Sequence, residues 1–119
     1  MKGENNNMNY EWYKPKSCRP YISIAKYRIG LSNGLMKEMG KVKWVKLGYS
    51  DETKSMVIKP CDPDDEYRLR ITGGIGPRIV NRGFIRYLIS KGIQIDDKVR
   101  KYIAIWNTED KICLIELKG

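Results

Sequence analysis

The stretch RIGLSNGLMKEMG, residues 28–40, predicts the end of a strand that leads through a helix cap into a very short helix. Ser32 and Asn33 are favourable N-cap residues, and Gly40 supplies a natural C-cap. A helix of this length is marginal in water by itself, because nucleation costs more than a few hydrogen bonds return. We therefore expect it to pack against another part of the chain.

A related stretch, RIVNRGFIRYLISKG, occupies residues 78–92 and predicts a longer helix that also ends in glycine. Each stretch is followed by a predicted hairpin, with the turn SDET in residues 43–60 and the turn TEDK in residues 101–117. The repeated order of strand, capped helix and hairpin indicates two copies of one unit. One such unit has too little apolar surface to fold alone, so the two copies are expected to share a sheet.

The chain of 119 residues has the length of one ordinary domain. We predict a mainly β fold with short helices, in the α+β class, and one compact domain over residues 20–119. The predicted segments are a flexible basic N-terminal arm at 1–19, a first repeat at 20–61, a solvated acidic linker at 62–66 and a second repeat at 67–119.

Residues 21–31, YISIAKYRIGL, alternate apolar and polar side chains as a strand does, but the apolar positions change from even to odd numbers. We predict a bulge or bend near residues 25–27. The glycine-rich segment TGGIGP, residues 72–77, is interpreted as the corresponding bend in the second copy.

The charge balance favours an anionic partner. The chain has 23 Lys and Arg residues against 14 Asp and Glu, no histidine, and a formal net charge of +9. Nucleic acid is the first candidate, and an anionic membrane surface or an acidic protein is the second. A basic protein that is merely soluble remains the alternative interpretation.

Nothing in the sequence indicates an enzyme, a metal site or a cofactor. Cys18, Cys61 and Cys113 are far apart, and no histidine is present to complete a zinc site. The acidic run at 62–66 lacks the ligand spacing of a calcium loop, and there is no cofactor fingerprint. The sequence shows neither a signal peptide nor an apolar window that could cross a bilayer, so we predict a cytoplasmic location without membrane association.

The first copy resembles a known DNA-binding module. ISIAKYRIGLSNGLMKEMG followed by KWVKLGYSDETKSMVIKP is similar to the swapped-hairpin domain of AbrB and SpoVT-type transition-state regulators. Tyr27 to Ile29 stand at the family's basic segment, Met39-Gly40 at its helix end and Val57 to Pro60 at its final strand. The resemblance covers residues 20–60 well and 67–118 loosely, and tandem copies in one chain resemble MraZ-type regulators.

This resemblance implies that two units interleave into one barrel-like body, either as a pseudo-dimer within one chain or as a homodimer. It also implies that basic residues on the first strand, the loop and the early helix contact duplex DNA. Arg86 lies one helical turn past the matched Arg82 and joins the set, and a basic arm would follow the phosphate backbone. The predicted DNA-contacting residues are Lys26, Arg28, Arg78, Arg82 and Arg86, with Lys14, Lys16 and Arg19 on the arm.

Other interpretations of the same residues stay open. The cations could form an ordinary solvated face of sheet and helix. Tyr13, Tyr21, Tyr27 and Trp44 alternate with cations, a pattern that suits either stacking on single-stranded bases or packing between strands.

The function predicted from the sequence is therefore a small DNA-binding transcriptional regulator. The alternative is a protein-interaction module, for example an antitoxin-like, phage-type or plasmid-type inhibitor, whose basic face binds an acidic protein without binding DNA. Binding of RNA or single strands through the tyrosines is a third hypothesis.

Overall fold

The computed structural model describes residues 9–13, 19–74 and 76–117. Over these residues the chain is mainly β with two short helices, which confirms the predicted α+β class. The elements are β1 (Tyr21–Ile24), β2 (Arg28–Leu31), α1 (Asn33–Met39), β3 (Trp44–Ser50), β4 (Ser55–Pro60), β5 (Leu69–Arg70), β6 (Arg78–Val80), α2 (Arg82–Ser90), β7 (Arg100–Ile103), β8 (Ile105–Asn107) and β9 (Ile112–Glu116).

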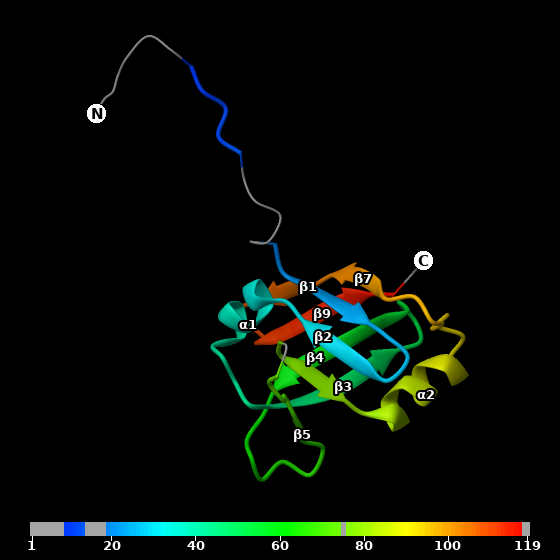
Figure 1. Ribbon diagram of the computed structural model, residues 1–119. Helices are drawn as coiled ribbons and strands as arrows, with labels where there is room; N and C mark the ends of the chain where they lie inside the picture. Colours follow the sequence, from blue (N-terminus) through cyan, green and yellow to red (C-terminus); the bar gives the residue numbers. More distant parts are fainter. Residues whose placement is uncertain (1–8, 14–18, 75, 118–119) are drawn as a thin grey trace.

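The strands form two antiparallel sheets (Figure 1). The four-stranded sheet has the order β6-β2-β1-β7, and the five-stranded sheet has the order β5-β3-β4-β9-β8. Each sheet contains strands from residues 20–61 and from residues 67–119. The two segments are therefore interleaved and do not form separate bodies.

The strand pairings of one half have counterparts in the other. β2 pairs with β6, with Ile29 opposite Ile79, and β4 pairs with β9. β5 precedes β6 as β1 precedes β2, so β1 and β5 are the first strands of the two halves. β1 pairs with β7, and β5 pairs with β3. The hairpin of β3 and β4 corresponds to that of β8 and β9. The first strand of each half thus pairs with a strand of the other half.

The strands do not close into the barrel that the resemblance implied. The sheets separate where β7 passes into β8 at the buried Ala104, whose N–H donates to the carbonyl oxygen of Pro20. They separate again at β5, which has two residues and is followed by a single bridge between Thr72 and Arg78. Strands this short leave too few paired residues to continue one sheet around the core.

The change of phase within residues 21–31 marks a hairpin and not a bulge. β1 and β2 are separate strands with Ile24 opposite Ile29, and the N–H of Ala25 donates to the carbonyl oxygen of Arg28 at 2.9 Å. In a hairpin with a two-residue loop, facing residues have numbers of opposite parity. The prediction of one bent strand was therefore wrong.

Each helix begins at a side chain that caps it, and for α1 this is the predicted Ser32. The hydroxyl of Ser32 accepts hydrogen bonds from the N–H of Leu35 at 3.1 Å and of Tyr21 at 3.0 Å, so one cap joins α1 to β1. The helix ends at Gly40, whose φ of 87° is the left-handed conformation expected of a C-cap glycine. Asn81 caps α2 by accepting from the N–H of Phe84 at 2.8 Å. Figure 1 shows α1 and α2 at opposite ends of the sheets.

One hydrophobic core lies between the sheets and under the helices. Its fully buried members come from both sheets and both helices, and they include Ile22, Ile29 and Ile79, Ile58 and Ile115, and Leu35 and Leu88. Since these residues come from both halves, neither half encloses a core of its own. Neither described helix is long and apolar enough to span a membrane.

Candidate nucleic-acid interface

The outer face of the four-stranded sheet is the face turned away from the core. Alternation along the strands buries Ile22, Ile24, Ile29, Leu31 and Ile79, and the register places the intervening residues on the other side. Among the described residues, this outer face contains cations and no carboxylate. Its residues are Tyr21, Ser23, Arg28, Gly30, Arg78, Val80, Lys101 and Ile103.

An open hollow of about 230 Å³ lies on this face, and Arg28 and Arg78 both line it together with Tyr21, Ser23 and Gly30. The register explains why these side chains meet. Gly30 pairs with Ser23 on one side and with Arg78 on the other. The loop before β6 forms a wall of the hollow, and it is held to β2 because the N–H of Leu31 donates to the carbonyl oxygen of Pro77 at 3.0 Å.

The two arginines of the hollow have no anionic partner within the described part of the chain. No ion pair joins Arg28 or Arg78 to a carboxylate there, although other cations of the protein form such pairs. The Nε atom of Arg78 is shielded from solvent and has no hydrogen-bond partner among the described residues. The Nε atom of Arg100 and the hydroxyl of Tyr49 are in the same state, so the unpaired charge of the two guanidinium groups, and not this atom, is what suits the hollow to an anion.

A second group of predicted residues meets around Tyr27, in the turn between β1 and β2. The guanidinium of Arg82, the first residue of α2, lies 4.7 Å from the centroid of the Tyr27 ring. The Nζ atom of Lys26 lies 5.7 Å from the same centroid and 3.6 Å from a carboxylate oxygen of Asp97. Lys26 is therefore partly neutralised by an exposed carboxylate that sequence reasoning did not connect with it.

The remaining predicted residues are more dispersed. Arg86 is exposed on α2, and Arg19 is exposed just before β1, but neither lines the hollow. Lys14 and Lys16 lie outside the described residues.

Three of the four aromatic residues singled out in the sequence have a cation over the ring, as described above for Tyr27. The Nζ atom of Lys101 lies 4.9 Å from the centroid of the Tyr21 ring, and the guanidinium groups of Arg68 and Arg70 lie 5.7 and 5.4 Å from that of Trp44. Tyr13 is exposed. These cation–π contacts leave less ring surface for stacking on bases.

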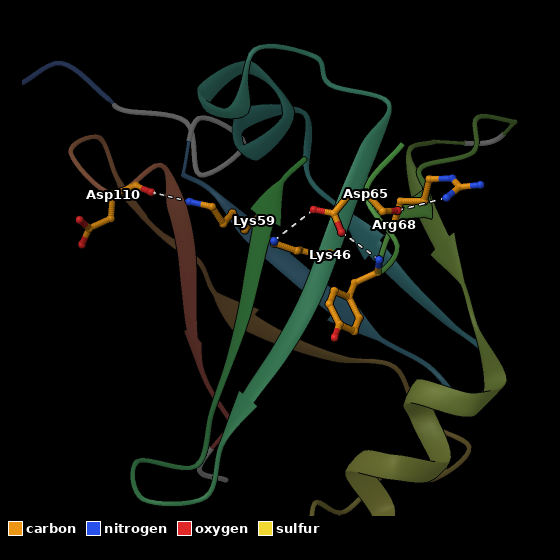
Figure 2. Close-up of polar contacts among 6 residues, drawn as sticks. Lys46, Lys59, Asp65, Arg68 and Asp110 are labelled. Carbon is orange, nitrogen blue, oxygen red and sulfur yellow. Dashed lines mark hydrogen bonds and ion pairs between the residues drawn. The ribbon is translucent and has the colours of Figure 1, made fainter. Parts of the chain in front are cut away.

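The cations of the five-stranded sheet are engaged differently, as Figure 2 shows. Lys46 and Lys59 are direct cross-strand neighbours on β3 and β4, an unfavourable pairing of like charges. Nζ of Lys46 lies 3.2 Å from a carboxylate oxygen of Asp65, and Nζ of Lys59 donates to the carbonyl oxygen of Asp110 at 3.1 Å.

Asp65 attaches the acidic linker to this sheet. The backbone N–H of Tyr67 donates to its carboxylate at 2.8 Å, and this bond, followed by that from Lys46, holds the pKa of Asp65 below its ordinary value. An Nη atom of Arg68 also donates to the carbonyl oxygen of Asp65. The side chain of Asp65 is only 21% exposed, so the linker is less solvated at this residue than expected.

The two described cysteines are not activated. Burial raises the pKa of Cys113 to about 12, and burial followed by the charge of Asp65 raises the pKa of Cys61. Both are free thiols. Within the described residues no group of three or more His, Cys, Asp or Glu side chains could hold a metal ion.

Sequence reasoning missed Ser23, Gly30 and Lys101 as members of the basic face. The sequence signal that could have found them is the alternation of apolar and polar residues along β1, β2 and β7. This alternation places Ser23, Gly30 and Lys101 on the side of the sheet that carries the cations. The cross-strand register that makes them neighbours depends on the pairing between the two halves, which a single strand does not encode.

Comparison with protein-family models, with curated proteins and with solved structures yields no match for this chain.

Proposed function

We propose that this protein is a small DNA-binding regulator that contacts duplex DNA through the outer face of the four-stranded sheet and the adjoining start of α2. One observation carries the proposal. Arg28 and Arg78, which occupy corresponding positions in the two halves, line one hollow on a face where the described residues include no carboxylate. Two such guanidinium groups suit the regularly spaced phosphates of a duplex.

We further propose that the fold is a swapped hairpin built from two copies of an AbrB-like unit. The pairing of each first strand with the other half supports this proposal, because β1 pairs with β7, the strand before the β8–β9 hairpin, and β5 pairs with β3 of the first hairpin. The pairing of β2 with β6 and of β4 with β9 is what a two-fold relation between the copies requires.

The chemistry of this face favours contacts to the DNA backbone over reading of base edges. Arg82 begins α2 at the positive end of the helix dipole, and the first turn of the helix contains no acidic residue. Phosphate contacts of this kind fix position and orientation on a duplex, and sequence preference then comes from DNA shape.

The test is titration of a fluorescently labelled duplex at several salt concentrations. We expect binding that weakens steeply with salt, because each phosphate contact releases counterions. The double variant Arg28→Ala with Arg78→Ala should lower the affinity on the order of a hundredfold and make the slope of log K against log salt shallower by about two.

The matched control is Lys46→Gln with Lys59→Gln, which also removes two positive charges from neighbouring strands. Since these lysines are engaged by Asp65 and by the Asp110 carbonyl oxygen, we expect a loss of affinity below about threefold. Absence of duplex binding at low salt, or equal losses in both double variants, would contradict the proposed function.

One observation favours the second candidate, an acidic protein partner. Val80 and Ile103 are 56% and 58% exposed on the same outer face as the cations, and apolar groups beside cations suit a protein surface better than a phosphate backbone. This candidate predicts a stable protein complex that survives nuclease treatment and is lost in Val80→Asp, together with no affinity for the duplex.

A further inference from the structure

The outer face of the four-stranded sheet is asymmetric, although the halves pair in corresponding ways. Arg28 and Arg78 occupy corresponding positions, yet the residue opposite Arg78 is Gly30 and the residue opposite Arg28 is Val80. The hollow lies on the glycine side, where no side chain fills the space. On the other side Val80 projects from the equivalent position.

The neighbouring strands show the same asymmetry. Next to Gly30 lies Ser23, whose partner on β7 is Lys101. In the other half the corresponding pair is Arg70 on β5 and Trp44 on β3, and the guanidinium of Arg70 packs 5.4 Å from the centroid of the indole. Bulky side chains therefore occupy the equivalent positions at the edge of the five-stranded sheet, whereas a hydroxyl and a glycine leave the space beside Arg78 open.

The absence of a side chain at Gly30 allows the Ser23 hydroxyl to lie inside the hollow. A Cβ atom built on Gly30 would lie 2.5 Å from the Oγ atom of Ser23, so any larger residue would displace that hydroxyl. The backbone of Gly30 does not have a positive φ, so conformational freedom is not what this position requires of glycine. Glycine is required here because it lets the Ser23 side chain approach closely and leaves open space beside it.

We propose that this hollow is a phosphate seat, defined by Arg28, Arg78, Ser23 and Gly30, that holds one phosphate group. The two guanidinium groups supply the positive charge and charge-assisted donors, and the Ser23 hydroxyl supplies a further donor. The inference rests on the proposed function where the phosphate belongs to duplex DNA. A free phosphate compound presents the same chemistry.

The test fills the seat without changing the charge of the protein. Gly30→Val in the full chain is compared with wild type by duplex titration at several salt concentrations and by calorimetric titration with inorganic phosphate. We expect the duplex affinity to fall about tenfold and the salt slope to become shallower by about one, since one phosphate contact is lost at constant protein charge. The control is Gly48→Val, which adds the same side chain to β3 of the five-stranded sheet, where a Cβ atom would have its nearest neighbour at 3.9 Å, and it should leave both quantities unchanged.

A second variant guards against a simple folding defect in Gly30→Val. Ser23→Ala removes only the hydroxyl from a half-exposed position, and circular dichroism should show that its fold is unchanged. We expect Ser23→Ala to lower the duplex affinity about threefold, as the loss of one hydrogen bond to an anion implies.

The outcomes separate the seat from the proposed function. If the wild type binds the duplex, and if both Gly30→Val and Ser23→Ala fold and bind it equally well, the phosphate seat is overturned and the proposal of DNA binding stands. If the wild type binds inorganic phosphate but no duplex, and Gly30→Val loses the phosphate, the seat is supported and a free phosphate compound is its ligand. If the wild type binds neither, both proposals are overturned.

Discussion

The outer faces of the two sheets carry similar numbers of cations but differ in how these cations are used. On the five-stranded sheet, Lys46 is paired with Asp65 of the linker and Lys59 with the carbonyl oxygen of Asp110 (Figure 2). On the four-stranded sheet, Arg28 and Arg78 line a hollow and have no ion pair with another described residue.

This difference shows that the net charge of +9 is not equally available over the surface. The acidic linker lies between the two halves in sequence and attaches to the five-stranded sheet, where Asp65 neutralises Lys46, one member of a like-charged cross-strand pair. Electrostatic attraction of an anionic partner depends on the local field and not on the total charge. The four-stranded sheet is therefore the face at which we expect such a partner.

If the two sheets belong to one cooperative folding unit, Ile79→Ala should destabilise both of them together. Ile79 is fully buried in the four-stranded sheet, so we expect the free energy of unfolding to fall by about 2–5 kcal/mol. Trp44 and Trp106 both lie in the five-stranded sheet, and their fluorescence should report the same shift in urea midpoint as circular dichroism.

Val80→Ala is the control for that variant, because it shortens an exposed residue on the same strand and should change the free energy of unfolding by less than about 0.5 kcal/mol. A tryptophan signal that keeps the wild-type midpoint in Ile79→Ala would show that the sheets unfold independently.

The cap of α1 gives the next largest expected effect. Ser32→Ala leaves the N–H groups of Leu35 and Tyr21 without their acceptor, and both groups lie at the junction of α1 with the four-stranded sheet. We expect a loss of about 1–2 kcal/mol in a urea titration. Asn81→Ala removes a single acceptor from α2 and should cost less; equal losses would mean that the bond to Tyr21 contributes nothing.

Lowering the pH should destabilise both sheets, because each is contacted by one aspartate whose pKa is lowered in the folded state. The N–H of Lys98 and then the guanidinium of Arg100 lower the pKa of Asp96 beside the four-stranded sheet, as the N–H of Tyr67 and then Lys46 lower that of Asp65. A carboxylate whose pKa is lower in the folded state than its unfolded value of about 3.9 stabilises the fold above that pH. This stabilisation is lost as the pH falls through the folded pKa.

The free energy of unfolding should therefore decrease as the pH falls below about 4. Asp65→Asn and Asp96→Asn should each be slightly less stable than wild type at pH 7 and approach it at low pH, as measured by urea titration. A constant difference across this pH range would rule out carboxylate ionisation as the cause.

The smallest effect is expected from releasing Lys46. Asp65→Asn removes its partner and raises the charge of the five-stranded face, so duplex affinity at low salt should rise by no more than about twofold. An increase of tenfold or more would show that this face binds DNA as well, and the contrast between the faces would no longer hold.

Local elements were largely predictable from the sequence. Ser32, Gly40 and the two hairpin turns act through residues within a few positions of each other, and both turns place a lysine, Lys54 or Lys111, at the same positive φ. The change of parity between Ile24 and Ile29 also contained the information for a two-residue hairpin, although it was interpreted as a bulge or bend within one strand. In each case the determining interaction is local in sequence.

The hollow and the neutralised face were not predictable in the same way. Gly30 lies opposite Arg78 only because β2 pairs with β6, and Asp65 reaches Lys46 only because the linker turns back over β3. Likewise, Lys26 was predicted as a DNA contact from its position in the chain, but Asp97 lies beside it in the fold.

By itself, the sequence determined the class of the fold, the order of its elements and the excess of positive charge, because caps, turns and alternation are short-range properties. Tertiary structure decided that the strands form two sheets instead of a closed barrel, and which cations keep their charge unpaired. The physical reason is that register between distant strands, set by burial of the shared core, chooses the neighbours of every surface side chain.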